Sequence, residues 1–283
     1  LIGMDAEWGL AMRLDSTYAF PWNMTLGAIE DNDIVRQVGK RIGEQSKRLG
    51  VHINFAPVVD INTNPNNPII GNRSFGEDKK NVSEKALAFM KGFHQAGILG
   101  SAKHFPGHGD TEDDSHKVLP TIDHTRERID SIELYPYRQL IKEGLNSVMV
   151  AHLNVPALED KLNFPSSLSK LGFNGLIFTD ALNMRGVANF DKPGEIDLAA
   201  FLAGNDILLI SEDIPKAHEL LVNAYREGTV TEERLAHSVK KILYAKYKVG
   251  LHNYQPVDTT YLVEELNTVN DDVLYEKAME NAL

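Results

Sequence analysis

Short apolar runs alternate with long amphipathic segments along almost the whole chain, and this alternation restricts the fold more than any other feature of the sequence. Several short runs are apolar on both faces, as strands buried in a parallel sheet must be. The longer segments, such as residues 34–49 and 231–248, repeat apolar residues at the spacing of an amphipathic helix. The predicted strands are residues 1–6, 51–60, 98–104, 147–155, 176–179 and 206–210. Strands alternating with helices predict a parallel sheet with right-handed crossovers, either doubly wound or closed as a (β/α)8 barrel.

Polar side chains that follow the predicted strands favour the barrel. They are Asp5 and Glu7, Asp60, Lys103 and His104, His152 and Asn154, and Asp180. In a barrel the carboxyl ends of all strands open onto one mouth, whereas an open sheet gathers such groups at one switch point. We therefore predict an α/β fold, a (β/α)8 TIM barrel. Because only six strand–helix units are visible, we expect the first two units to be missing from this chain.

Both ends of the sequence read as interrupted elements. Residues 1–6 begin as a strand already under way, and no signal peptide is visible before it. After residue 250 a polar turn leads to a predicted helix that reaches Leu283 without a stop signal. We expect a piece of a longer protein, in which residues 1–250 form the partial barrel and residues 251–283 form a linker and helix leading out of it.

Charge and composition exclude several classes of function. The 29 Lys and Arg residues against 40 Asp and Glu residues give a net charge of −11, so we expect no nucleic-acid partner. The chain has no cysteine, which excludes thiolate metal sites, cysteine nucleophiles and disulfides. No uninterrupted apolar run approaches the ~20 residues of a membrane-spanning helix, so no span is expected in this chain.

The densest polar stretch runs from Lys103 to His116, leaving a predicted strand and entering a loop with proline and glycine. Asp114 and His116 are two residues apart, so the carboxylate can orient the imidazole. An imidazole titrates near pH 6.5, which suits an acid that must later act as a base. Lys103 ends an apolar strand, and since a buried unpaired ammonium is costly, it indicates an anionic or polyhydroxyl partner. A second block, residues 177–184, places Asp180 at the end of another strand.

These residues resemble a known family. The sequence KHFPGHG at 103–109, followed by DSH at 114–116, resembles glycoside hydrolase family 3, in particular its β-N-acetylglucosaminidase branch. The block TDALNM at 179–184 resembles the nucleophile motif of that family, and residues 5–9, 54–60 and 72–76 match it in the expected order. Trp8 departs from the pattern, because the family usually has a second glycine there. This indole packs either beside the substrate or at the barrel rim.

The resemblance implies a retaining exo-β-N-acetylhexosaminidase that releases terminal β-linked GlcNAc by double displacement. The implied catalytic residues are Asp180 as nucleophile, His116 as acid/base and Asp114 as the partner of His116. The hydroxyl groups of the sugar would be held by Asp5, Arg73, Lys103 and His104. The resemblance implies no cofactor and no metal.

The resemblance also bears on the substrate and the compartment. The implied substrate is a carbohydrate containing GlcNAc, in particular a fragment of the bacterial cell wall, which would place the enzyme in peptidoglycan turnover. The family includes cytoplasmic enzymes and exported multidomain ones. The tail after residue 250 resembles a linker into an additional C-terminal domain, which favours a periplasmic or exported bacterial protein.

Three alternatives remain open. A family 3 β-glucosidase or xylosidase would generally take its acid/base from a second domain, and the Asp114–His116 pair argues against it. A metal-dependent hydrolase would use His104, His108, His116 and Asp180 as ligands, although Pro106 and two glycines make this segment a loop. A non-catalytic sugar-binding module would usually have lost its nucleophile or its acid. The roles of Asp60, His108 and His152 are left open, with a structural pairing of Asp60 and a loop-shaping role of His108 as the simplest interpretations.

Overall fold

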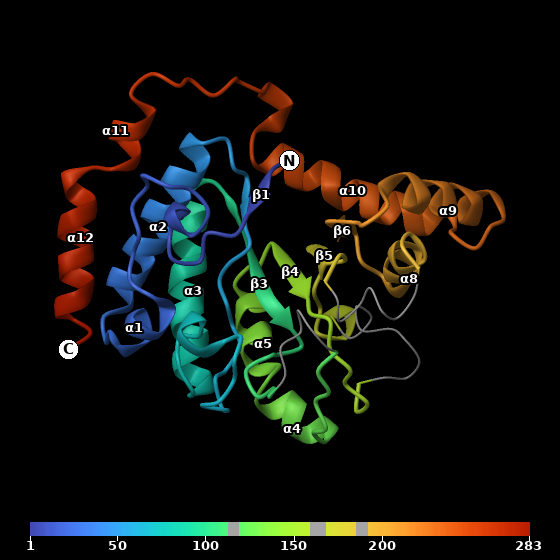
Figure 1. The fold of residues 1–283 in the computed structure, drawn as a ribbon, viewed down its shortest axis with the longest axis horizontal. Helices are drawn as coiled ribbons and strands as arrows, with labels where there is room; N and C mark the ends of the chain where they lie inside the picture. The colour runs from blue at the N-terminus through green and yellow to red at the C-terminus, as the bar shows by residue number, and fades with distance from the viewer. Residues whose placement is uncertain (113–118, 159–167, 185–191) are drawn as a thin grey trace.

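The computed structural model describes residues 1–112, 119–158, 168–184 and 192–283. Six parallel strands follow one another across a single curled sheet in the order in which they occur in the chain (Figure 1). The strands are β1 (Gly3–Met4), β2 (Ile53–Asn54), β3 (Leu99–Phe105), β4 (Ser147–Val150), β5 (Leu176–Ala181) and β6 (Ile207–Leu209). The predicted α/β class with a parallel sheet is confirmed, because each strand pairs in parallel with the next and the connections carry helices.

Helices cover the sheet in two groups. In Figure 1, α2, α3 and α5 lie along the first strands, and α8, α9 and α10 lie beside the last ones. The helices of the first group and its surroundings are α1 (Asn23–Ala28), α2 (Asn32–Arg48), α3 (Lys79–Ala96), α4 (Arg126–Ser131) and α5 (Tyr135–Lys142), with 3-10 turns η1 (Leu10–Met12) and η2 (Gly71–Arg73). The later elements are α8 (Glu195–Ala203), α9 (Ile214–Arg226), α10 (Glu232–Lys248), η3 (Leu251–Asn253), α11 (Leu262–Leu266) and α12 (Val269–Glu280).

The predicted strand 51–60 is longer than the β2 of the structure. Residues after β2 still run beside β3, with the Lys103 N–H donating to the Pro57 carbonyl and the Val59 N–H donating to the Lys103 carbonyl. Regular pairing is interrupted there because Pro57 has no N–H to donate. The irregular path carries Asp60 to the carboxyl end of the sheet.

The helices α2 and α3 pack closely against each other. Asp31 caps the start of α2 and Asp78 caps the start of α3, each side chain accepting backbone N–H bonds. A Cβ atom added at Gly92 of α3 would lie 2.4 Å from the Arg36 carbonyl oxygen of α2. The absence of a side chain at Gly92 therefore sets how closely the two helices approach.

Two large apolar layers lie against the sheet, and a small third cluster around Phe201 joins α8, α9 and β6. The larger one fills the space between the strands and the first group of helices. The smaller one lies inside the curl of the sheet and takes a side chain from most strands: Ile53, Phe55, Leu99, Met149, Leu176 and Phe178, with Ala245 of α10. The rings of Phe55 and Phe178 meet edge to face at 5.4 Å across this inner layer. The inner layer forms the floor beneath the polar groups at the strand ends.

The segment after residue 250 folds back along α2 and ends at α12 (Figure 1). The Arg41 Nη2 atom of α2 lies 2.9 Å from Asp271 Oδ2, and the Gln45 amide donates to the Leu266 carbonyl at 2.9 Å. Leu266 and Ala278 are buried in the larger apolar layer. These contacts attach residues 251–283 to the first group of helices.

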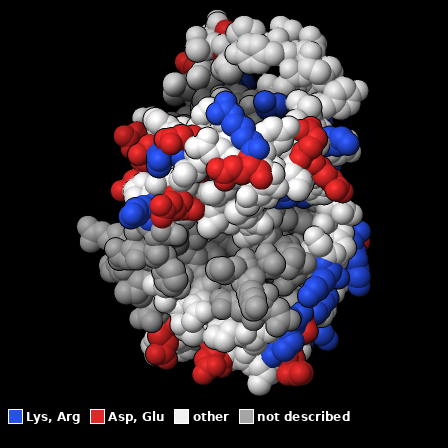
Figure 2. Space-filling view, turned by 90° about the vertical axis from the view of Figure 1, so that its right-hand side faces the viewer, with Lys and Arg blue, Asp and Glu red and all other residues white. Residues whose placement is uncertain are grey.

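The outer surface is mixed in charge. On the face shown in Figure 2, acidic and basic side chains lie next to one another over the helices α9 and α10. Within the described ranges, no helix has both the length and the apolar character that a bilayer crossing would require.

Candidate active site

A cavity of about 700 Å³ lies at the carboxyl ends of the strands. We call it the strand-end cavity. Side chains from the ends of β1, β3 and β5, and from the segment after β2, converge on it, as expected for parallel strands that open onto one side. The charged and aromatic side chains that line it are Asp5, Glu7, Trp8, Arg13, Phe55, Arg73, Lys103, His104, His108 and Asp180.

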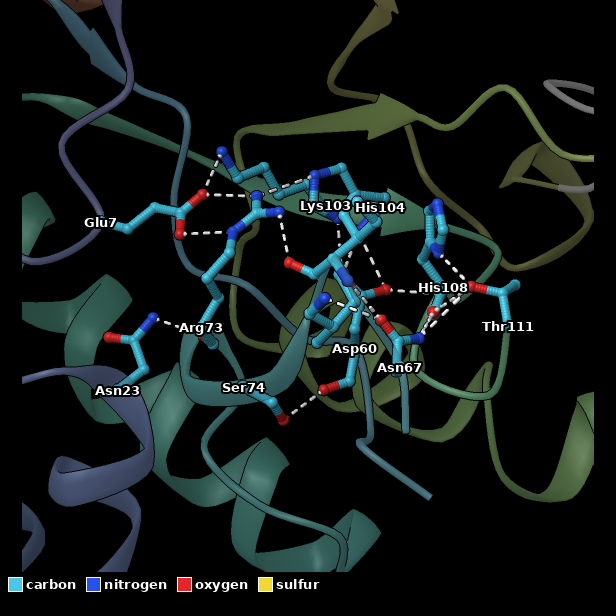
Figure 3. Close-up of polar contacts among 12 residues, drawn as sticks. Glu7, Asn23, Asp60, Asn67, Arg73, Ser74, Lys103, His104, His108 and Thr111 are labelled. Carbon is cyan, nitrogen blue, oxygen red and sulfur yellow. Dashed lines mark hydrogen bonds and ion pairs between the residues drawn. The ribbon is translucent and has the colours of Figure 1, made fainter. Parts of the chain in front are cut away.

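Four charged side chains that line this cavity bind one another: Asp5, Glu7, Arg73 and Lys103, here called the Lys103 cluster. The half-exposed Arg13 also binds Asp5, at 2.9 Å. Lys103 Nζ lies 2.8 Å from Asp5 Oδ1 and 2.7 Å from Glu7 Oε1. Arg73 binds Glu7 with two parallel contacts, Nη2 to Oε1 at 2.8 Å and Nε to Oε2 at 3.0 Å (Figure 3). Lys103 is 2% exposed and Glu7 is fully buried. Two acids therefore balance two bases, which is the condition for burying an ammonium group.

The Lys103 cluster remains charged in spite of its burial. Burial alone would raise the pKa of Glu7, but Lys103 and Arg73 outweigh it and lower that pKa from 4.5 to about 2. Burial would likewise lower the pKa of Lys103, but Glu7 and Asp5 raise it above its ordinary value. For Asp5, burial is again outweighed, here by Lys103 and Arg13, so its pKa is lowered. The site consequently presents fixed charges at neutral pH.

His104 is oriented by Asp60. Its Nδ1 atom lies 2.7 Å from Asp60 Oδ2, and its Nε2 atom lies 3.3 Å from Arg73 Nη2 (Figure 3). Because a guanidinium N–H can only donate, Nε2 must accept, so the proton resides on Nδ1 and is donated to Asp60. Asp60 thus pairs with His104 and fixes its tautomer.

His108 lies at the start of the loop that follows β3. Its backbone N–H donates to Asp60 at 2.7 Å, and its Nδ1 lies 2.6 Å from the Thr111 hydroxyl. The Asn67 amide donates to the His108 carbonyl at 2.8 Å (Figure 3). Burial lowers the pKa of His108. These hydrogen bonds hold the start of this loop against the segment after β2.

Asp180 lies near the end of β5 and lines the same cavity as the Lys103 cluster. Its Oδ1 atom accepts the N–H of Ala181 at 2.8 Å. His152, beyond the end of β4, lies 3.0 Å by its Nε2 atom from the Ala181 carbonyl oxygen. Burial lowers the pKa of His152, and nearby Asp180 opposes that shift. A neutral imidazole that donates to the residue after Asp180 holds the end of β5 in place.

The structure brings together five of the seven residues predicted from the sequence. Asp5, Arg73, Lys103, His104 and Asp180 all face the strand-end cavity. The other two, Asp114 and His116, lie outside the described residues. Glu7 was noted only as a polar residue after a strand, yet it contacts both bases of the Lys103 cluster. The sequence does indicate a role for Glu7, because Glu7 is two residues after Asp5. Side chains two positions apart in an extended segment point to the same side, so both acids are expected to face the same space.

No metal site is formed by the parts of the chain that the structure describes, since they contain no group of three or more His, Cys, Asp or Glu side chains placed to hold an ion. His104 and His108 each make specific contacts there, with Asp60 and Thr111 respectively.

Comparison with known proteins gives a consistent pattern. The sequence profile of the glycosyl hydrolase family 3 N-terminal domain matches residues 1–245. The chain is 36% identical to β-hexosaminidase A of Pseudoalteromonas piscicida, over 88% of this chain and 47% of that protein. It is 31% identical to a β-N-acetylglucosaminidase/β-glucosidase of Cellulomonas fimi, over 89% of this chain and 48% of that protein.

A solved structure extends the likeness to three dimensions. A glycoside hydrolase family 3 β-N-acetylglucosaminidase from Paenibacillus sp. str. FPU-7 superposes with a TM-score of 0.91 at 36% identity. The match covers 100% of this chain and 56% of that one. The chain spans about half the length of the curated relatives it matches.

Proposed function

The chain belongs to glycoside hydrolase family 3, and from this premise we propose that it is the catalytic part of a retaining exo-β-N-acetylhexosaminidase. The substrate is a carbohydrate with a terminal β-linked GlcNAc, and fragments of bacterial cell wall are the natural source that we propose. The names of the hexosaminidase relatives support the choice of sugar.

One observation carries the proposal: a buried set of fixed charges and a strand-end carboxylate line one cavity. The Lys103 cluster and His104 supply hydrogen-bond donors and acceptors at its deep end, and Asp180 lines the same space. Oriented donors and acceptors of this kind suit the hydroxyl groups of a single sugar ring. The cavity also has the volume of a small-ligand site, about 700 Å³.

In the proposed reaction, the Asp180 carboxylate attacks the anomeric carbon while His116 gives a proton to the departing oxygen. Asp114 orients His116. Water then attacks the glycosyl–enzyme ester, His116 takes the proton of that water, and the Asp180 carboxylate leaves. Two inversions retain the β configuration. Asp5, Arg73, Lys103 and His104 hold the sugar throughout.

A second candidate is a β-glucosidase activity at the same site. It is favoured by one observation, the Cellulomonas fimi relative that is named for both activities. Asp180 and the Lys103 cluster would keep their roles, and only the group recognised at the 2-position of the sugar would differ.

We also propose that the six strands are part of a (β/α)8 barrel in which residues 1–250 form the catalytic unit. The strands follow chain order with parallel pairing throughout, and the polar groups gather at their carboxyl ends. A longer protein would supply the remaining units and an additional C-terminal domain.

The test is hydrolysis of an aryl β-N-acetylglucosaminide beside the matching aryl β-glucoside, using the full product of the gene. Selective release from the acetylated sugar supports the proposed activity. Release mainly from the glucoside favours the second candidate, and no release from either contradicts both.

A further inference from the structure

The sequence contains two tryptophans, and the structure places them together. Trp8 and Trp22 are 14 positions apart in the chain, yet their ring centroids are 4.0 Å apart with the planes inclined by 38°. Trp8 lines the strand-end cavity, and Trp22 is 44% exposed beside it. We call this feature the tryptophan pair.

Both tryptophans are tied to the Lys103 cluster through their neighbours in the chain. Trp8 follows Glu7, whose carboxylate is bound by Lys103 and Arg73. Trp22 precedes Asn23, whose side-chain amide donates to the Arg73 carbonyl at 2.7 Å (Figure 3). The backbone N–H of Phe20 donates to the Trp8 carbonyl at 2.9 Å and joins the two segments. The pair is therefore held at a fixed place relative to the deep end of the cavity.

Core packing does not account for this pair. Neither indole belongs to the apolar clusters formed by the described residues. A large aromatic surface left open next to a binding cavity is typical of a recognition site.

We propose that the tryptophan pair is a stacking site for a second pyranose ring, the one joined to the sugar held by the Lys103 cluster. This inference rests on the proposed function. Lys103, which is 2% exposed, and Trp8 both line the cavity, and Trp22, which is 44% exposed, packs on Trp8. In this proposal the tryptophan pair forms the outer, aromatic end of the cavity, its mouth. When the terminal sugar ring is bound in the interior, the sugar ring joined to it lies at that mouth. The C–H groups on one face of a pyranose pack on an indole ring, while its hydroxyl groups remain in water.

The first experiment uses the tryptophans as their own reporters. Trp8 and Trp22 are the only two tryptophans in this 283-residue sequence, so the fluorescence that Trp8→Phe and Trp22→Phe remove from the protein reports on this pair. Asp180→Asn protein, which should bind without turnover, is titrated with GlcNAc and with N,N′-diacetylchitobiose. We expect a saturable change in fluorescence with the disaccharide and a much smaller one with the monosaccharide. Equal responses to the two sugars would overturn the second-ring site.

The second experiment measures kcat/KM on two substrates with alcohol leaving groups, methyl β-N-acetylglucosaminide and N,N′-diacetylchitobiose. Trp22→Ala should lower kcat/KM about tenfold on the disaccharide and change it little on the methyl glycoside. Trp8→Phe, which keeps a flat ring, should lie between Trp22→Ala and wild type. The control is Tyr244→Ala, which also removes a large exposed aromatic side chain, here on α10. It should match wild type on both substrates.

The outcomes separate the two proposals. In one outcome, wild-type protein cleaves both substrates, and Trp22→Ala and Trp8→Phe cleave them equally well. This result would overturn the stacking site and leave the hexosaminidase proposal standing. Wild-type protein that neither cleaves nor binds any of these sugars would overturn both.

Discussion

Replacing Glu7 with glutamine tests the electrostatic account of the site directly. The substitution keeps the size of the side chain and removes the charge that Lys103 and Arg73 share. Because the pKa of Glu7 falls from 4.5 to about 2 on folding, its charged form contributes about 3 kcal/mol to stability at neutral pH. Removing one partner of a buried ion pair costs a similar amount, about 3–5 kcal/mol, because the other charge remains buried.

The assay is the free energy of unfolding from urea titration at pH 7, for wild type, Glu7→Gln and a control. Glu44→Gln is a suitable control, because Glu44 forms an exposed pair with Lys40 on α2, 2.6 Å apart. An exposed pair of that kind contributes about 0.5 kcal/mol or less. We expect Glu7→Gln to lose about 3 kcal/mol and Glu44→Gln to lose almost nothing.

The pH dependence gives a second check on the same variant. A carboxylate whose pKa is depressed on folding stabilises the protein above its unfolded pKa, and this contribution disappears as the pH falls through the folded one. The difference in stability between wild type and Glu7→Gln should therefore be full above pH 4.5 and shrink toward pH 2. A loss at pH 7 no larger than that of the control, or a difference that does not change with acid, would refute the reasoning.

The other predictions concern catalysis and packing. Asp180→Asn should keep the fold and lower kcat by at least about 10³-fold on an aryl β-N-acetylglucosaminide, and near-normal turnover would remove Asp180 from the nucleophile role. His116→Ala should cost about 10²–10⁴-fold on sugars with poor leaving groups and far less on activated aryl glycosides, whereas equal losses would contradict its role as the acid. Gly92→Ala should lower the free energy of unfolding by roughly 1–3 kcal/mol, because the new Cβ would overlap the Arg36 carbonyl. Unchanged stability in urea would show that α2 and α3 can move apart freely.

The order of the strands could be predicted from the sequence because it depends on local patterns. Each apolar run was followed by a helical pattern, and the rule for parallel crossovers then leaves few arrangements. The position of Lys103 at the end of an apolar strand was equally informative. An ammonium group there must be paired, so a site with acids could be expected at that end of the sheet before any partner was known.

Contacts between distant segments could not be read in this way. The packing of α12 on α2 joins Arg41 to Asp271, 230 positions apart, and nothing in either helix alone indicates its partner. The pairing of Trp8 with Trp22 likewise depends on how the segment after β1 turns back, which is set by tertiary contacts such as the Asn23–Arg73 bond. The shortening of the second strand was foreseeable in part, since Pro57 lies inside the predicted range.

The division of roles between Asp5 and Glu7 depends on burial. The two acids are two positions apart and both bind Lys103, so spacing alone makes them equivalent. Both acids have their oxygens bound by cations, Asp5 by Lys103 and Arg13 and Glu7 by Lys103 and Arg73. Burial therefore separates them: Glu7 is fully buried, so it can only hold Lys103 and Arg73 in place. Asp5 is 29% exposed and lies beside the open space of the cavity. A sugar hydroxyl can therefore reach Asp5 and not Glu7, and Glu7 acts on the substrate only through the two bases that it positions.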